Sequence, residues 1–296
     1  MVIKRFFIAV FIVCGAIIFA FPFFSDRKLH LVFCDVGQGD ATLIKYKSYE
    51  VLVDGGPSGT KLLDCLSKNI PPWDREIELV VLSHPESDHL TGLIDVLEKY
   101  EVKQIVLNSI IKESAVFWQF RQKVIAEKSQ IYLPRAGDQL KLGPLNLVVL
   151  WPKEKLGDNR LWQEAPAATE TSPQVLGAAT VSGEINNTSV VLKLSFGAFD
   201  ALLSGDIGFA AEEVIDFPEV EVLKVPHHGS RYSTSEGFLD QSKPQLAVIS
   251  VGKNSFGHPT QEVIDRLEKA KAKIRRTDQS GEIEIVSDGK KWGIKR

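Results

Sequence analysis

The sequence is poor in cysteine and methionine, with three Cys and one Met in 296 residues. Cys14, Cys34 and Cys65 show no paired spacing, so the sequence predicts neither a disulfide framework nor a cysteine-based zinc site. We expect Cys34 and Cys65 to be small core residues. The chain also has no large excess of positive or negative charge, because its net charge is −3. Any contact with nucleic acid therefore has to come from a local basic patch.

The remaining composition is that of a folded domain. Hydrophobic residues make up 44% of the chain, which is long enough for one compact domain with a sizeable core. This excludes disorder of the chain as a whole.

A long apolar run opens the chain. Residues 6–24 carry no charge, and about 18 such residues are enough to cross a hydrocarbon core. We therefore expect residues 1–28 to be a signal peptide or membrane anchor, with membrane contact through residues 4–24 and an anchored or secreted domain outside the cytoplasm. Ile18 is bulky where a cleavage site needs a small residue, which favours an anchor. A buried helix is the alternative, but a soluble helix would show one polar face.

Alternating apolar runs after the anchor predict strands and helices of an α/β domain. A region near 160–184, rich in Ala, Thr, Ser, Pro and Gly, predicts a mobile loop between two βα halves. The Asp-Gly turn in 281–296 predicts a terminal hairpin. Strands are expected at 29–34, 41–46, 50–56, 77–83, 102–108, 145–151, 189–196, 199–205, 220–226 and 245–252, and helices at 62–69, 90–100, 115–128, 210–215 and 261–271.

Metal-ligating residue types gather behind these strands. The segment SHPESDH places His84, Asp88 and His89 within six positions, directly after an apolar run. Imidazole and carboxylate groups are common ligands of divalent cations, so this spacing predicts a metal site. Asp206 ends another strand and is a candidate bridging carboxylate, although a helix cap is the alternative.

The same motifs carry a family resemblance. SHPESDH resembles the THxHxDH signature of the metallo-β-lactamase superfamily, and LVDGG, SGDIG, VPHHGS and FGHP follow that family in order over residues 29–296. CDVGQGDATLI, NNTSVVL and LKVPHHGS resemble the extracytoplasmic hydrolase domain of ComEC-type competence proteins, here in a stand-alone form. The resemblance implies a four-layer αββα sandwich over residues 29–296.

The resemblance also implies roles for individual residues. Glu86 stands where typical members have a second His, and Asn187 stands where a third would align, so the first of two sites gains oxygen donors and Mn²⁺ becomes an alternative to Zn²⁺. Asp54 and the loop 35–40 resemble supports beside the metals, and turn formation is their alternative role. The implied ligands of the two divalent cations are His84, Asp88, His89, Asp206, His228 and His258, and the implied catalytic residues are Asp88, His227 and His258; which of His227, His228 and His258 binds metal stays open.

The expected activity is hydrolysis by a metal-activated water. For the substrate we expect a DNA phosphodiester, and for a partner the DNA-uptake machinery, because the resemblance is to a competence protein. A basic cluster between Arg266 and Arg276 offers contacts to a phosphate backbone, although a solvated helix face and edge strand explains it equally well. A hydrolase of β-lactams or small esters and a non-catalytic DNA-binding module are the alternatives.

Overall fold

Two β-sheets form the centre of the molecule. The computed structural model describes residues 26–163 and 185–295. The first sheet has the order β15-β14-β1-β2-β3-β4-β5-β6 and the second the order β13-β12-β11-β10-β9-β8-β7. The strands of the first sheet are β1 (Leu29–Phe33), β2 (Thr42–Tyr46), β3 (Tyr49–Val53), β4 (Glu76–Val81), β5 (Glu101–Val106), β6 (Gln130–Tyr132), β14 (Ile283–Ser287) and β15 (Trp292–Ile294). Those of the second are β7 (Gln139–Leu142), β8 (Leu145–Trp151), β9 (Val191–Phe196), β10 (Phe199–Leu203), β11 (Val222–Lys224), β12 (Leu246–Ile249) and β13 (Lys273–Arg276).

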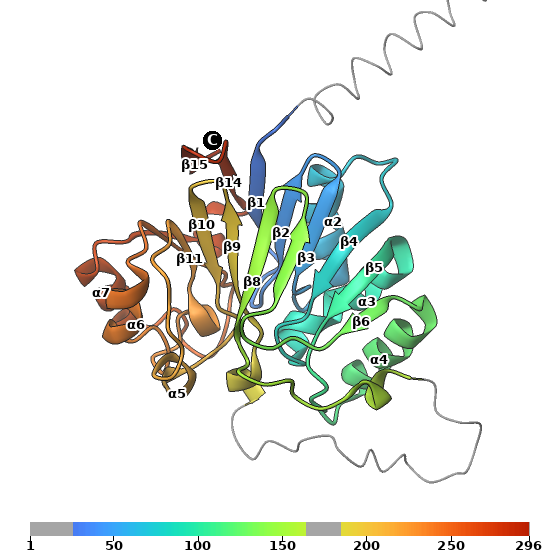
Figure 1. The fold of residues 1–296 in the computed structure, drawn as a ribbon. Coiled ribbons are helices and arrows are strands. Elements are labelled where there is room, and N and C mark those ends of the chain that lie inside the picture. The colour runs from blue at the N-terminus through green and yellow to red at the C-terminus, as the bar shows by residue number, and fades with distance from the viewer. Residues whose placement is uncertain (1–25, 164–184, 296) are drawn as a thin grey trace, which may run out of the picture.

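Helices cover the outer face of each sheet (Figure 1). On the first sheet they enclose a buried cluster that includes Leu62, Leu93 and Phe117, and on the second a cluster that includes Phe238 and Val263. A third cluster lies between the sheets, so the layers are helix, sheet, sheet, helix. The helices are α2 (Gly59–Asn69), α3 (Ser87–Lys99), α4 (Ala115–Glu127), α5 (Phe209–Glu212), α6 (Glu236–Ser242), α7 (Gln261–Lys269) and α8 (Thr277–Ser280), with 3-10 turns η1 (Asn159–Trp162), η2 (Ile185–Thr188) and η3 (Pro226–Gly229).

The pairing of the strands places their ends. β1, β2 and β3 run antiparallel as predicted, and β14 and β15 form the predicted terminal hairpin. β3, β4, β5 and β6 pair in parallel, as do β10, β11, β12 and β13. In each sheet the parallel strands therefore present their carboxyl ends at one common edge, where loops form binding sites in layered α/β folds.

The prediction that the chain forms no disulfide was wrong, whereas the predicted burial of Cys34 and Cys65 in the core is confirmed. Cys34 and Cys65 are buried, but they form a disulfide with a Cα separation of 5.9 Å. The bond ties the segment after β1 to α2. The sequence did not predict this disulfide because the two cysteines are 31 positions apart and meet only when α2 packs on the first sheet.

Two predicted segments lie largely outside the described residues. The expected signal or anchor falls mainly on residues 1–25, and most of the expected loop falls on residues 164–184. The first residues of that loop form η1, with Leu161 and Trp162 buried. Within 26–163 and 185–295, no helix is both long enough and apolar enough to span a membrane.

Candidate metal centre

The predicted site residues come together at the strand ends. His84 follows β4, while Asp88 and His89 lie in the first turn of α3. Asp206 follows β10, and His228 lies in η3 after β11. Segments more than one hundred residues apart in sequence therefore form one pocket.

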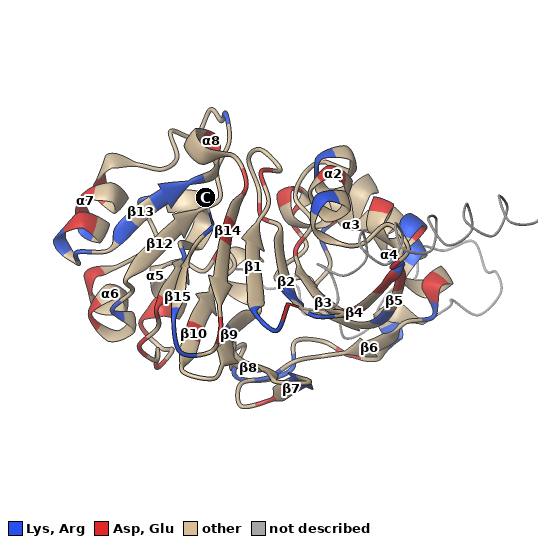
Figure 2. Cartoon of the chain, turned by 90° about the horizontal axis from the view of Figure 1, so that it is seen from above, with Lys and Arg blue, Asp and Glu red and all other residues tan. Residues whose placement is uncertain are grey.

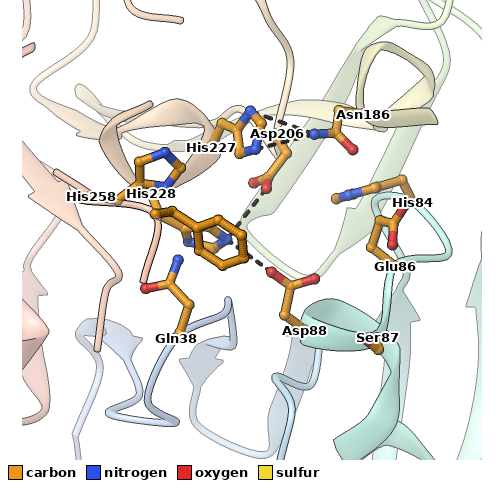
Figure 3. Close-up of a pocket in the computed structure, with 11 residues that line it drawn as sticks. Gln38, His84, Glu86, Ser87, Asp88, Asn186, Asp206, His227, His228 and His258 are labelled. Atoms are coloured by element: carbon orange, nitrogen blue, oxygen red, sulfur yellow. Dashed lines mark hydrogen bonds and ion pairs between the residues drawn. The ribbon is translucent and has the colours of Figure 1, made fainter. Parts of the chain in front are cut away.

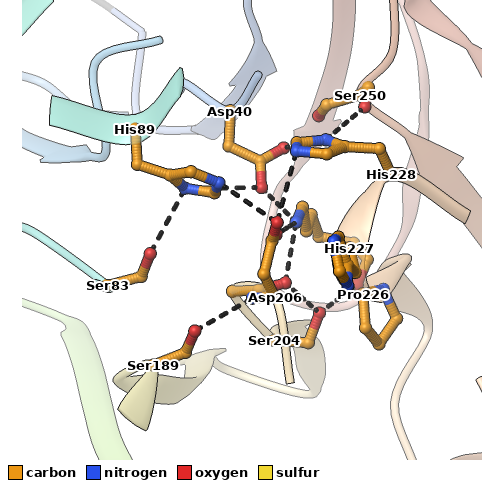
Figure 4. A network of polar contacts seen from close by, with 12 residues as sticks. Asp40, Ser83, His89, Ser189, Ser204, Asp206, Pro226, His227, His228 and Ser250 are labelled. Atoms are coloured by element: carbon orange, nitrogen blue, oxygen red, sulfur yellow. Dashed lines mark hydrogen bonds and ion pairs between the residues drawn. The ribbon is translucent and has the colours of Figure 1, made fainter. Parts of the chain in front are cut away.

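Donor atoms from both sheets approach one another at this pocket. Nε2 of His228 lies 3.3 Å from Oδ2 of Asp206 (Figure 3), and Nε2 of His89 lies 3.3 Å from the same oxygen (Figure 4). Nε2 of His228 also lies 3.4 Å from Oδ2 of Asp88. The set contains two nitrogen and two carboxylate oxygen donors.

The spacing of these atoms fits a divalent cation. A tetrahedral cation with ligands at about 2.0–2.2 Å separates neighbouring donors by roughly 3.3 to 3.5 Å. Nε2 of His84, His89 and His228 is buried and makes no hydrogen bond within the described residues. Buried polar atoms normally have partners, so these three nitrogens are placed for a group that the described protein does not supply.

Neighbouring residues aim the two imidazoles at the centre. Nδ1 of His89 lies 2.9 Å from Oδ2 of Asp54. Oδ2 of Asp54 also accepts a hydrogen bond from the hydroxyl of Ser83, and its Oδ1 accepts one from the backbone N–H of Ser83. Nδ1 of His228 donates to the carbonyl of Ser250 at 2.9 Å. Such contacts fix ring orientation and leave Nε2 for the metal. Asp54 (φ 60°) and His228 (φ 54°) adopt left-handed backbone conformations, a strain that commonly marks functional sites.

A buried ion-pair network lies behind the ligands (Figure 4). The ammonium of Lys224 contacts Oδ2 of Asp40, Oδ1 of Asp206 at 3.2 Å and the carbonyl of Gly205 at 2.8 Å. Asp40 also has an oxygen within metal-site distance of the His donors, but it lies nearest to Nδ1 atoms, 3.7 Å from that of His228. Asp40, His89, Asp206 and His228 thus form a buried group whose donor atoms lie within 4.8 Å of one another, and Asp40 is at the same time the partner of Lys224.

The charges show what the centre is built to hold. Burial alone would lower the pKa of His228, but the carboxylates of Asp206 and Asp40 outweigh it and raise this pKa to about 10. Likewise, Asp206 and Asp54 raise the pKa of His89 well above its usual value, against the effect of burial. The carboxylates draw protons onto both rings, which a divalent cation would replace.

Donors for a second cation are fewer. His84 offers its buried Nε2, while Glu86 lines the same pocket and pairs with Lys112 at 2.7 Å. The side chain of Asn187, where we expected a third imidazole, instead accepts a hydrogen bond from the backbone of Gly208, and its neighbour Asn186 lines the pocket. The position around His84 is therefore less complete than the one around Asp206.

His227 and His258 lie further out. Nε2 of His227 lies 3.2 Å from the amide nitrogen of Asn186, and its ring centre lies 5.6 Å from that of His258. Burial, followed by the charges of His227 and His228, lowers the pKa of His258 to about 4. Burial also lowers the pKa of His227, so both rings are neutral near pH 7. The open cavity has a volume of about 450 Å³ and is lined by Gln38, His84, Glu86, Ser87, Asp88, Asn186, Asp206, His227, His228, Phe256 and His258.

Sequence reasoning missed several members of the site. For Lys224 the sequence does carry a signal: a lysine within an otherwise apolar strand indicates that its charge has a buried partner. Ser83 and Ser189, which contact Nδ1 of His84, left none. The basic cluster lies apart from the pocket lining, on α7 and the edge strand β13 (Figure 2).

Comparisons with known proteins agree with this geometry. ComE operon protein 3 of Bacillus subtilis is 29% identical over 301 residues, covering 90% of this chain and 34% of that protein. Recombination protein 2 of Haemophilus influenzae is 27% identical over 257 residues, covering 85% and 28%. The chain spans roughly a third of the length of these curated relatives. Competence protein ComA of Neisseria gonorrhoeae is 23% identical over 283 residues, covering 94% of this chain and 35% of that protein. These relatives confirm the resemblance to ComEC-type competence proteins.

The fold has counterparts among solved structures. YhfI, a metallo-beta-lactamase fold protein from Bacillus subtilis, superposes with a TM-score of 0.54 at 11% identity and covers 88% of this chain and 100% of its own. The family model of the metallo-beta-lactamase superfamily matches residues 34–253, which include every strand end that bears a donor of the centre. Since that match extends over more than half of the sequence, the chain belongs to the metallo-beta-lactamase superfamily.

Proposed function

We propose that this metal-dependent hydrolase of the metallo-beta-lactamase superfamily cleaves phosphodiester bonds of DNA outside the cytoplasm. The observation that carries the hydrolytic chemistry is the approach of donor atoms from both sheets: Oδ2 of Asp206 lies 3.3 Å from Nε2 of His89 and of His228, and Nε2 of His228 lies 3.4 Å from Oδ2 of Asp88. These residues would hold the first cation, and His84 with Glu86 a second, weaker one. Bound divalent cations supply Lewis acidity and lower the pKa of water.

We further propose that Mn²⁺ supports activity better than Zn²⁺. Half of the first donor set is carboxylate oxygen, and the neighbouring position has Glu86 in place of an imidazole. Oxygen donors suit harder cations such as Mn²⁺, whereas Zn²⁺ binds best with nitrogen or sulfur.

The protein's own residues have distinct proposed tasks. Asp88 orients the attacking water with its carboxylate, whose pKa is lowered: burial alone would raise it, but the contact with His228, whose Nε2 lies 3.4 Å from Oδ2 of Asp88, outweighs burial. His227 and His258 are neutral near pH 7, so each can donate a ring N–H to a substrate oxygen without carrying charge. This favours a role in holding the substrate over transfer of a proton from an imidazolium.

DNA is the proposed substrate because of the relatives and the surface charge. The names of two relatives contain recombination and competence, and the DNA-uptake machinery is the proposed partner. Part of the basic cluster is neutralised, since Lys269 pairs with Glu236 and Arg276 with Asp278. Lys271, Lys273 and Arg275 make no ion pair with the described residues and remain available for phosphates; they are exposed.

The disulfide supports the proposed location. Disulfides persist in oxidising compartments and are rare in the cytosol, and Cys34 and Cys65 form one here. We propose that residues 1–28 target or anchor the chain and that the catalytic domain lies outside. Protease added to intact cells should degrade the domain; complete protection in intact cells together with cleavage after lysis would contradict this location.

One set of assays tests the activity. The purified chain is treated with chelator, supplied with Mn²⁺ or Zn²⁺, and offered single-stranded DNA, a phosphodiester dye ester and a chromogenic lactam. We expect cleavage of DNA with Mn²⁺ and a loss of several orders of magnitude in Asp88→Ala, since single oriented groups alone are worth roughly 10²-fold. Glu98→Gln, an exposed change on the same helix, is the matched control. Lactam turnover without DNA cleavage, or DNA binding without any turnover, would assign one of the alternative functions.

A further inference from the structure

An exposed phenylalanine stands at the mouth of the metal pocket. Among the described residues, four large hydrophobic side chains are exposed, and Phe256 is the most exposed at 70%. It is the only one of the four that lines the pocket containing Asp88 and Asp206. A single exposed apolar residue is ordinary on a protein surface, but its place beside a set of metal donors is not.

The backbone holds this ring in place. Oδ1 of Asn254 accepts hydrogen bonds from the backbone N–H groups of Phe256 (3.0 Å) and His258 (3.1 Å). The amide of Asn254 donates to the carbonyls of Gly252 and His258, both at 2.9 Å. Because one side chain makes four bonds across the loop, the loop is ordered before any ligand arrives, and binding costs less conformational entropy.

Phe256 is the outermost of three neighbouring rings, followed by His258 and His227. Its ring centre lies 5.7 Å from that of His258, with the planes tilted by 31°. His258 in turn lies 5.6 Å from His227, whose backbone is adjacent to His228. Because Phe256 lines the same pocket as Asp88, Asp206 and His228, a flat group laid on its ring would lie at the mouth of that pocket.

We propose that Phe256 is a stacking platform for an unpaired nucleobase next to the scissile phosphate. The inference rests on the proposed function and adds a substrate class to it: single strands, or ends that have frayed. In a duplex, both faces of an internal base are already stacked on neighbours, so only an unpaired base can present a face to this ring. Aromatic stacking contributes about 1–3 kcal/mol per base, roughly a 5- to 150-fold change in binding.

The test uses the full chain and Phe256→Ala. We expect kcat/KM for a short single-stranded oligonucleotide to fall 5- to 150-fold in this variant, while an oligonucleotide with an abasic position next to the cleaved bond loses little. Phe256→Trp should restore the rate, and Phe256→Leu, which keeps apolar contact without an aromatic face, should not. Tyr232→Ala is the matched control, because Tyr232 is 66% exposed but does not line the pocket.

A spectroscopic measurement separates this inference from the activity. 2-Aminopurine placed in the oligonucleotide should be quenched on binding to the wild type and to Phe256→Trp, but not to Phe256→Ala. If DNA is cleaved and Phe256→Ala matches the wild type on both oligonucleotides, the stacking role of Phe256 is contradicted and the proposed nuclease activity is supported. If quenching depends on Phe256 but no metal gives cleavage, the stacking role of Phe256 is supported and the proposed nuclease activity is contradicted. If neither quenching nor cleavage depends on Phe256, the inference is overturned.

Discussion

The two imidazoles at the centre hold protons where a cation would bind. The pKa of His228 is raised to about 10 and that of His89 well above its usual value, so both rings are charged near pH 7 without a metal. Binding a divalent cation must then release about two protons, and affinity should rise by roughly 100-fold for each pH unit. Titrating Mn²⁺ into the metal-free chain at pH 6, 7 and 8 checks this expectation. An affinity independent of pH would show that the rings are already neutral.

Asp54 is expected to act through His89. Its carboxylate accepts from Nδ1 of His89 and from Ser83, but Asp54 is not a member of the buried group formed by Asp40, His89, Asp206 and His228. Loss of such an orienting partner commonly costs 10- to 100-fold in metal affinity, so we expect Asp54→Asn to weaken Mn²⁺ binding by that factor. Competition with a metal-sensitive dye measures it. Asp265→Asn, a substitution at an exposed carboxylate on α7, should leave affinity unchanged.

Glu50 is a residue whose burial should oppose folding at high pH. Its side chain is fully buried, neither carboxylate oxygen makes a hydrogen bond with a described residue, and burial raises its pKa from 4.5 to about 8. The folded state then binds more protons than the unfolded state between these values, so stability falls as pH rises from about 4.5 to 8. Glu50→Gln should therefore raise the free energy of unfolding by about 1–3 kcal/mol at pH 8.5, and the gain should vanish by pH 5. Urea unfolding of this variant and of the exposed control Glu213→Gln measures the difference; an equal gain at both pH values would contradict it.

At the scale of elements, long apolar strands were predictable and short edge strands were not. β4, β8 and β10 are apolar runs between polar breaks, which is the strongest strand signal a sequence carries. β7 (QLKL) and β13 (KIRR) are edge strands of four residues each, too short for a clear apolar pattern; β7 was not predicted, and an edge strand at β13 was expected only as the alternative to a phosphate-binding surface.

The part of the site that is local in sequence was predictable, and the part that depends on the tertiary fold was not. His84, Asp88 and His89 lie within six positions, so sequence spacing predicted them as a cluster. Which outer histidine would face Asp206 could not be predicted, because the answer depends on left-handed backbone at His227 and His228. The disulfide and Lys224 likewise depend on packing between distant segments.

The disulfide is expected to stabilise the segment that carries Asp40. It joins the end of β1 to α2 across 31 residues, and a cross-link of that length contributes about 3–4 kcal/mol in the chain-entropy model. We expect Cys34→Ala with Cys65→Ala to lower the melting temperature by roughly 5–15 °C. Reductant should lower the melting temperature of the wild type in the same way but leave the double variant unchanged; an equal effect on both would place the cause elsewhere.

At the scale of the whole molecule, the centre connects the two sheets. Asp88 and His89 follow the first sheet, and Asp206 and His228 follow the second, so one cation would cross-link the halves. A ligand at 1,000 times its dissociation constant stabilises the folded state by about 4 kcal/mol. Chelation should therefore lower the melting temperature of the wild type, and His89→Ala should remove the response. Scanning calorimetry with Mn²⁺ and with chelator tests both statements, and a response that survives in His89→Ala would locate the stabilising cation at another site.

The strand β1 pairs on one side with β2 and on the other side with β14. β14 is far along the chain: His30 on β1 contacts Glu284 on β14 across 254 sequence positions. During synthesis, the backbone groups on that side of β1 therefore stay unpaired until almost the whole domain has emerged. The first sheet can be completed only after translation of β14, so folding of this half cannot run strictly in step with the ribosome. A nascent chain stalled before residue 283 should bind chaperones and resist oxidation to the native disulfide more than the finished chain does.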